Sequence, residues 1–137
     1  HLDFAVGRLS PLLDDLRASS RYATAPVGVA GVQPDFLNMA VVGRSRLAPA
    51  DLLDALLAIE AERGRVRPYP NAPRTLDLDL ILAGDLVLVT PDLTVPHPRF
   101  RERRFVLEPL AEIAPDLVDP VSGLSVAALL SRLPTHP

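Results

Sequence analysis

Alternation of apolar and acidic residues at positions 73–82, Pro-Arg-Thr-Leu-Asp-Leu-Asp-Leu-Ile-Leu, constrains the fold of this chain more than any other feature. The leucines fall on even positions, and Asp77, Asp79 and Ile81 fall on odd positions. Successive side chains of a β-strand point to opposite faces, so the run predicts a strand with one apolar face. The other face would carry two carboxylates roughly 7 Å apart, given a rise of about 3.3 Å per residue.

Two acids at this spacing repel each other unless a cation lies between them. Mg²⁺ is the natural partner, because this hard ion takes oxygen ligands and often joins one or two carboxylates to substrate phosphates. The alternative is a solvated polar face on an edge strand, where charges deter aggregation. Arg74, a permanent cation at the start of the run, favours phosphate chemistry.

Length and composition indicate one domain with its own core. The chain has 137 residues, of which 48% are hydrophobic, and this is too short for two ordinary domains. A net charge of −3 argues against bulk attraction to nucleic acid or to an anionic membrane. There is no cysteine and no apolar run of about 18 residues, so we expect no disulfide and no membrane span. These features fit a cytoplasmic protein.

Hydrophobic spacing and the positions of proline and glycine predict a mixed order of helices and strands. Helices are expected at 1–17, with Pro11 bending or splitting the first, and at 49–63, 105–113 and 126–133. Strands are expected at 17–24, 36–47 and 86–89, the last returning from a Gly84-Asp85 turn after the acidic run. Loops are expected at 25–35 and 64–73.

Two polar residues interrupt apolar patterns. Asn38 lies in the apolar strand 36–47, where it either bonds its own backbone or directs its amide at a heterocycle. Glu60 falls within the leucine stripe of the helix 49–63, and acids are seldom buried unpaired. It is therefore either paired with a basic residue or directed at a ligand pocket.

Basic residues gather in two places. Arg65 and Arg67 precede Arg74 and the two aspartates, which is typical of a site for a polyphosphate and a metal, although a solvated basic loop would have the same composition. His97 lies between two prolines, and this stiff setting favours a ligand contact over a structural role. A second group of four arginines is mixed with phenylalanines at 99–105, a composition that also suits single-stranded nucleic acid.

Five motifs, in this order, resemble those of the 2-amino-4-hydroxy-6-hydroxymethyldihydropteridine pyrophosphokinase family. They are Ala-Pro-Val-Gly at 25–28, Gln-Pro-Asp-Phe-Leu-Asn at 33–38, Gly-Arg-Val-Arg at 64–67, Pro-Arg-Thr-Leu-Asp-Leu-Asp at 73–79 and Leu-Thr-Val-Pro-His-Pro at 93–98. The resemblance covers 2–123 and implies a single α+β domain over 1–137, with a ferredoxin-like antiparallel sheet and packed helices. It also implies transfer of pyrophosphate from ATP to 6-hydroxymethyl-7,8-dihydropterin, with release of AMP.

The resemblance also implies residue roles, position by position. Asp77 and Asp79 would hold two Mg²⁺ ions, and Arg65 and Arg74 would act as catalytic phosphate clamps. ATP would contact Glu60, Arg67, Arg74, Thr94, His97 and Arg103. The pterin would bind among Thr24, Val27, Phe36, Asn38 and Phe105.

The chain departs from the family at three points. The family begins with a strand and a Gly-Ser-Asn type loop, which we expect this chain to lack; Asn71-Ala72 replaces an Arg-Trp-Gly segment; and Pro98 replaces a tyrosine. The first departure keeps open a second hypothesis, a member that binds nucleotide or pterin without turnover, perhaps within a fused folate enzyme. We expect a monomer that uses two small-molecule substrates and binds neither nucleic acid nor membrane.

Overall fold

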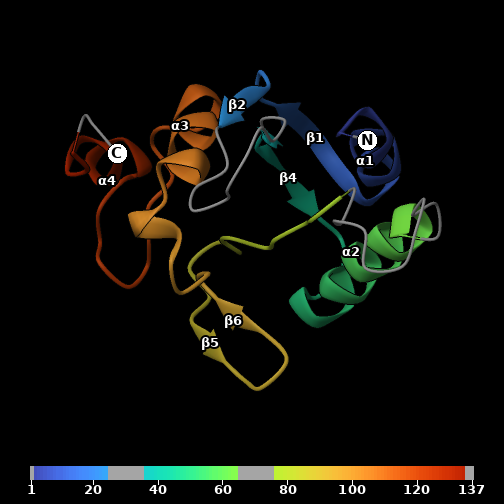
Figure 1. Cartoon of the computed structure of the whole chain (residues 1–137). Coiled ribbons are helices and arrows are strands. Elements are labelled where there is room, and N and C mark those ends of the chain that lie inside the picture. Colours follow the sequence, from blue (N-terminus) through green and yellow to red (C-terminus); the bar gives the residue numbers. More distant parts are fainter. Residues whose placement is uncertain (1, 25–35, 65–75, 135–137) are drawn as a thin grey trace.

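The computed structural model describes residues 2–24, 36–64 and 76–134 (Figure 1). Helices and antiparallel strands are mixed along the chain, so the predicted α+β class is confirmed. In order, the elements are α1 (Leu2–Leu9), the 3₁₀ turn η1 (Ser10–Leu12), β1 (Leu13–Ala18), β2 (Tyr22–Thr24), β3 (Phe36–Asn38), β4 (Val41–Ser45), α2 (Pro49–Gly64), β5 (Leu88–Val89), β6 (Thr94–Val95), the 3₁₀ turn η2 (Phe100–Glu102), α3 (Arg104–Ile113) and α4 (Val126–Ser131).

A two-stranded ribbon forms the middle of the molecule. β1 pairs with β4 and β2 pairs with β3, both antiparallel. Ser19 joins the two ladders, because its backbone N–H donates to the carbonyl of Ala40 at 2.9 Å and its Oγ accepts from the Ala40 N–H at 2.8 Å. The predicted strands at 17–24 and 36–47 are therefore confirmed in place, each with a short interruption.

The predicted helix at 1–17 is wrong beyond Leu9, because Pro11 lies in η1 and β1 begins at Leu13. Proline lacks the N–H that the helix needs and clashes with the preceding turn. Leu13 and Leu16 share a three-residue spacing and are both half-buried, which imitates a helical stripe. A β-bulge between Asp14 and Arg17, with Asp15 at φ 53°, inserts the extra residue that produces this spacing within a strand.

Two hydrophobic clusters lie on either side of the ribbon. One joins α1, α2 and the extended segment that begins at Leu76, through Ala5, Leu9, Leu56, Ile59 and Leu76. The other joins η2, α3 and α4 through Phe100, Leu107, Leu110, Ala114, Val126 and Leu129. The segment 76–83, the acidic segment, crosses between these two groups of helices in Figure 1. Leu78 and Leu80 pack on the first cluster, and Ile81 and Leu82 pack on the second.

The acidic segment is extended but is not a strand of any sheet formed by the described residues, so the predicted strand at 76–82 is wrong as to its pairing. Its alternation of faces is confirmed over 76–80: Leu76 is buried, Leu78 and Leu80 are half-buried, and Asp77 and Asp79 are exposed. Beyond Leu80 the predicted alternation is wrong, because Ile81, expected on the acidic face, is half-buried and packs with Leu82 on the second cluster. Alternation specifies which side chains point inward, whereas a ladder also needs a neighbouring backbone to bond with.

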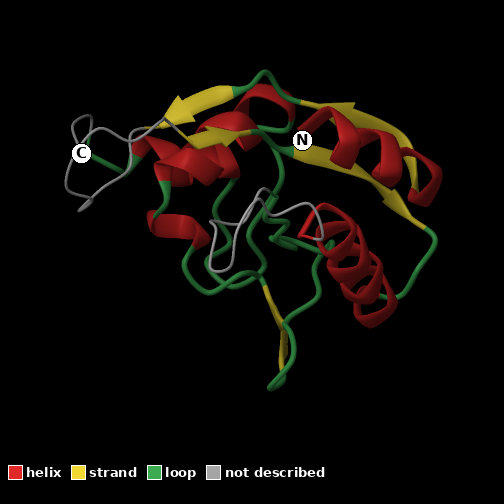
Figure 2. Cartoon of the chain, turned by 45° about the vertical axis from the view of Figure 1, so that its right-hand side comes forward, coloured by secondary structure: helices red, strands yellow, loops and turns green. Residues whose placement is uncertain are grey.

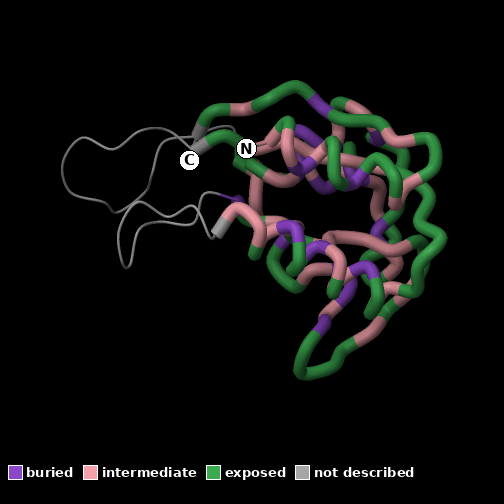
Figure 3. The backbone as a smooth tube through the Cα atoms, turned by 90° about the vertical axis from the view of Figure 1, so that its right-hand side faces the viewer, coloured by how far each residue is buried: buried purple, intermediate pink, exposed green. Residues whose placement is uncertain are grey.

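The predicted turn at Gly84-Asp85 is confirmed, with Gly84 at φ 58°. Its predicted return strand is shorter than expected and pairs forward with β6 rather than back with the acidic segment. The β5–β6 hairpin projects from the body in Figure 2, and Figure 3 shows its tip exposed. Helices were expected at 49–63, 105–113 and 126–133; α2, α3 and α4 confirm them to within two residues at each end.

Candidate active site

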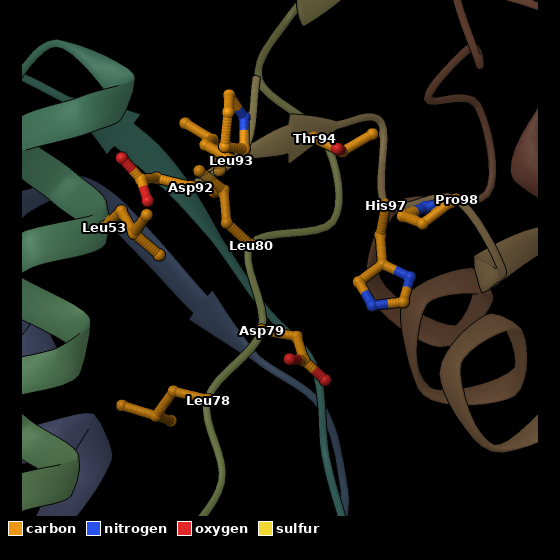
Figure 4. A pocket seen from close by; sticks show the side chains of 10 residues that line it. Leu53, Leu78, Asp79, Leu80, Asp92, Leu93, Thr94, His97 and Pro98 are labelled. Atoms are coloured by element: carbon orange, nitrogen blue, oxygen red, sulfur yellow. The ribbon is translucent and has the colours of Figure 1, made fainter. Parts of the chain in front are cut away.

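An open pocket of about 260 Å³ lies where α2, the acidic segment and the β5–β6 hairpin meet residues 97–98 (Figure 4). Its lining combines leucines with a few polar groups, which is the usual composition of a small-molecule site. The lining residues are Leu53, Leu78, Asp79, Leu80, Pro91, Asp92, Leu93, Thr94, His97 and Pro98.

Three of the site residues predicted from the sequence come together in this pocket: Asp79, Thr94 and His97. They are brought in from the acidic segment, from β6 and from the loop after β6. In Figure 4 the Asp79 carboxylate and the His97 imidazole point toward the same gap, whereas the Asp92 carboxylate is directed toward α2. A carboxylate, a hydroxyl and an imidazole beside an apolar wall can bind a ligand that is both flat and charged.

His97 is held at both its backbone and its ring. Its N–H donates to the Ile81 carbonyl at 2.8 Å, which ties this loop to the acidic segment. Its Nδ1 accepts from the Arg99 backbone N–H at 3.3 Å. In a neutral imidazole this bond leaves the proton on Nε2, so that the free edge of the ring is a hydrogen-bond donor.

The acidic segment is anchored by α2 at one backbone position. Oε2 of Glu60 accepts from the Leu78 N–H at 2.6 Å, and Leu78 is the residue between Asp77 and Asp79. The half-buried Glu60 carboxylate thus has at least one protein partner, the Leu78 backbone amide. With Leu78 fixed by this bond and its side chain directed inward, the neighbouring side chains of Asp77 and Asp79 are exposed to solvent.

No group of three His, Cys, Asp or Glu side chains able to hold a metal ion occurs in the described part of the chain. Mg²⁺ needs no such cluster, since it takes one or two carboxylates and completes its shell with water and substrate phosphates. Asp77 and Asp79 are exposed carboxylates on the same face of an extended segment, and Asp79 borders the pocket, so the residues present fit such an ion.

The positions predicted to bind the pterin lie elsewhere, on the β2–β3 ladder and at the start of α3. Thr24 pairs with Phe36 and Tyr22 pairs with Asn38, so these four positions share one face of the ladder. Tyr22 uses this face to donate from its hydroxyl to Glu112 Oε1 at 2.7 Å, which places the ladder beside α3. Phe105, in the first turn of α3, is 41% exposed and available for stacking.

The arginine and phenylalanine group at 99–105 is only partly available for a ligand. Arg101 is paired with Asp119, and Arg104 is paired with Glu108 at 3.0 Å and also donates to the Pro134 carbonyl. Arg103 lies over the Phe105 ring at 5.5 Å. Two of its four arginines, Arg101 and Arg104, are paired with acids of the same chain. The patch is therefore a weaker candidate for nucleic-acid binding than its composition suggested.

The remaining predicted residues Val27, Arg65, Arg67 and Arg74 lie outside the described residues. Of those that are described, Asp77, Glu60, Asn38, Arg103 and Phe105 do not line the pocket. Thr24 and Phe36 are placed here by their backbone register alone.

Two acids were missed by the sequence reasoning. Asp119 is fully buried against Arg101, and Glu112 joins α3 to the ribbon. The hydrogen bond from Tyr22, and then that from the Ser20 backbone, lower the pKa of Glu112 from its ordinary value. The excess of arginine at 99–104 was a usable signal, because buried or half-buried guanidiniums require acids from elsewhere in the chain.

None of the helices in the described ranges is long and apolar enough to cross a bilayer. The family model described as 7,8-dihydro-6-hydroxymethylpterin-pyrophosphokinase matches residues 1–115.

Curated proteins with similar sequences agree. A 2-amino-4-hydroxy-6-hydroxymethyldihydropteridine pyrophosphokinase of Synechocystis sp. is 44% identical over 143 residues, covering 93% of this chain and 72% of that protein. The protein of the same name from Pseudomonas aeruginosa is 49% identical over 116 residues, covering 85% of this chain and 70% of that protein. The folic acid synthesis protein fol1 of Pneumocystis carinii is 40% identical over 121 residues, which cover 88% of this chain but 16% of that protein.

Proposed function

Because the chain belongs to the 7,8-dihydro-6-hydroxymethylpterin-pyrophosphokinase family, we propose how its residues divide the work of that reaction. The reaction transfers pyrophosphate from ATP to hydroxymethyldihydropterin in folate synthesis. The hydroxymethyl oxygen attacks the β-phosphorus of ATP, the bond from that phosphorus to the oxygen shared with the α-phosphorus breaks, and AMP leaves.

The pocket between α2 and the β5–β6 hairpin takes the nucleotide. The observation that carries this assignment is the convergence of Asp79, Thr94 and His97 on one lining that is otherwise rich in leucine. An apolar slot suits the flat base, and the Thr94 hydroxyl and the Nε2–H of His97 supply directed hydrogen bonds. The triphosphate then extends toward Asp79.

Asp77 and Asp79 would hold magnesium, with two ions as the proposed number. Bound Mg²⁺ neutralises the phosphate charge that develops during transfer and keeps the phosphates in line with the attacking oxygen. The protein's share is to keep the two carboxylates outward and separated, which the Glu60–Leu78 hydrogen bond supports. We also assign Glu60 its predicted place near the nucleotide, as the anchor of this segment.

Arginines supply the remaining positive charge. Arg103 in the described part, together with Arg65, Arg67 and Arg74, would clamp the phosphates, because a guanidinium binds phosphate oxygens in a bidentate manner. Phosphoryl-type transfer requires that the reactants be positioned and that the phosphate charge be neutralised, and it needs no protein nucleophile. Catalysis in this chain would therefore be electrostatic.

The pterin would bind against the β2–β3 face and α3. Asn38 would bond the polar edge of the ring, and Phe105, which is 41% exposed, would stack on it. Thr24, Val27 and Phe36 would complete the site. The finer description of the fold as ferredoxin-like, the monomeric state and the cytoplasmic location are part of the same proposal.

An assay for AMP tests the function directly. Purified protein is incubated with ATP, Mg²⁺ and 6-hydroxymethyl-7,8-dihydropterin, and AMP is coupled to an optical readout. We expect AMP formation that requires both the pterin and Mg²⁺. A chain that melts cooperatively, binds both ligands and forms no AMP would contradict the assignment of turnover to this chain and would favour a binding role.

A further inference from the structure

Asp119 is a fully buried carboxylate that accepts hydrogen bonds from one arginine and from two backbone amides. Its Oδ2 accepts from Arg101 Nε, and its Oδ1 accepts from a terminal nitrogen of Arg101 at 2.8 Å. The backbone N–H groups of Val121 and Ser122 donate to the same carboxylate at 3.1 and 3.3 Å. A charge with 0% exposure is tolerated only with compensation of this kind, and the planar fork of arginine matches it.

The turn that holds Asp119 is itself fixed. The Asp119 N–H donates to the Leu124 carbonyl at 2.9 Å, and the Gly123 N–H donates to the Asp119 carbonyl at 2.8 Å. Gly123 has φ 75°, a conformation that glycine adopts without strain. Val126, at the start of α4, is fully buried just beyond this turn. Asp119 is thus held in a fixed position, and it can fix the position of Arg101 and of the loop that contains Arg101.

Arg101 lies in the middle of residues 97–103, the arginine loop. Its guanidinium also lies 4.9 Å from the centre of the Phe100 ring, which is buried in the α3–α4 cluster. These two residues attach the loop to the body of the protein. On one side of them is His97, which lines the pocket, and on the other is Arg103, which we have assigned to the phosphates.

We propose that Asp119 is a positioning residue for nucleotide binding, because through Arg101 it fixes the loop that presents His97 and Arg103. This inference rests on the proposed function. Asp119 lies beyond residue 115, where the match to the family model ends. The residue that positions the arginine loop therefore comes from a part of the chain outside that match. The guanidinium of Arg101 also holds the pKa of Asp119 well below its ordinary value, which keeps the pair charged at any working pH.

The test compares Asp119→Asn and Arg101→Lys with a matched control. Arg101→Lys keeps the positive charge but loses the two-nitrogen fork, and it remains informative if Asp119→Asn fails to fold. The control is Ser125→Ala, which removes the hydroxyl that caps α4 by accepting from the Ala128 N–H at 3.1 Å. It weakens the same C-terminal segment without touching the arginine loop.

Two quantities are measured for each protein: the melting temperature, and the Kd for α,β-methylene-ATP with Mg²⁺ by calorimetry at a temperature well below melting. All three substitutions should lower the melting temperature. Only Asp119→Asn and Arg101→Lys should raise the Kd, by about tenfold, which corresponds to about 1.4 kcal/mol of lost binding.

Kd values for Asp119→Asn and Arg101→Lys that match the wild type and the control, despite lower melting temperatures, would show that the pair is merely structural. That result would overturn the inference and leave the proposed function intact. A wild-type protein that binds no Mg²⁺–nucleotide would instead overturn the proposed function, and the inference would fall with it.

Discussion

The acidic segment and the arginine loop meet at the pocket that we propose for the nucleotide, and they are held in different ways. The arginine loop is attached by a buried phenylalanine and a buried ion pair, both part of the α3–α4 side of the molecule. The acidic segment has no ladder to any described strand, and its backbone forms hydrogen bonds at Leu78 with Glu60, at Ile81 with His97 and at Ala83 with Leu86. The arginine loop is thus held by a buried aromatic side chain and an ion pair, whereas the acidic segment is held by the packing of its apolar side chains on both clusters and by single backbone hydrogen bonds.

This difference suits the chemistry proposed for each wall. A phosphate clamp works best when its donors are preorganised, because then no energy is spent on ordering them during the reaction. Carboxylates that hold Mg²⁺ between themselves and a substrate must instead adjust as phosphates enter, since Mg²⁺ demands near-octahedral geometry. We therefore expect substitutions in the acidic segment to affect turnover most, and substitutions behind the arginine loop to affect affinity and stability.

The largest effect is expected from Asp79→Ala. Loss of this carboxylate would remove a proposed ligand of the metal that neutralises the phosphates, so turnover should fall by about 10³-fold or more. Because Asp79 is exposed, the melting temperature should change little. Steady-state AMP formation and thermal melting are measured side by side. Asp85→Ala, an exposed acid in the turn that follows the segment, is the control. Near-normal turnover of Asp79→Ala with Mg²⁺ would remove this residue from the metal site.

The next effect concerns the anchor of the acidic segment. Glu60→Leu leaves the half-buried Leu78 N–H unpaired, so the free energy of unfolding should fall by about 1–3 kcal/mol. Turnover should also fall, by about 10- to 100-fold, as the aspartates lose their orientation. Glu60→Gln keeps an acceptor and should lose much less of both quantities.

Glu62 provides the comparison on the same helix. It pairs with Arg8 at 2.5 Å, but both side chains are more than a third exposed, so Glu62→Leu should cost less than about 1 kcal/mol. Denaturant unfolding and AMP formation are measured for the three variants. Equal losses for Glu60→Leu and Glu62→Leu would mean that the acidic segment needs no anchor from α2.

A third prediction distinguishes the proposed pterin site on the β2–β3 face from the acidic segment and the arginine loop. Asn38→Ala should weaken pterin binding by about tenfold or more, because a polar group of the bound ring would be left without its partner. Binding of α,β-methylene-ATP should be unchanged, since Asn38 does not line the nucleotide pocket. Calorimetry with each ligand gives both numbers. Similar losses for the two ligands would take Asn38 out of the pterin site.

The smallest effect is a pH dependence of stability. Arg101 holds the pKa of Asp119 below its unfolded value of about 3.9, so the stabilisation is complete above that pH and is lost as the pH falls below it. The difference in unfolding free energy between the wild type and Asp119→Asn should shrink by about 1–2 kcal/mol between pH 4 and pH 2.5. Urea unfolding over this range measures it. A difference that stays constant with pH would show that the carboxylate is not charged against Arg101.

Much of the molecule could be predicted from the sequence. Spacing located α2, α3 and α4, the two strands of the ribbon and the inward face of the acidic segment. The family resemblance supplied Asp79, Thr94 and His97, which the fold then gathers in one pocket.

The failures have physical causes. The bulge at Asp15 gave a strand the spacing of a helix, and the alternation at 76–82 could not reveal whether a neighbouring strand was present. Asp119 was missed because long-range ion pairs leave no periodic signal: its partner Arg101 is 18 residues away in the sequence. Such partners become visible only once the chain has folded.

We propose that the acidic segment and the arginine loop bind one Mg²⁺–nucleotide between them, and amide NMR of the 14.8 kDa protein can follow both segments in one titration. α,β-Methylene-ATP is titrated with and without Mg²⁺. We expect Mg²⁺-dependent shifts of the amides at 77–80 together with those of Thr94, His97 and Arg103, and smaller shifts along β1 and β4. Shifts that exclude either wall, or that are the same without Mg²⁺, would contradict it.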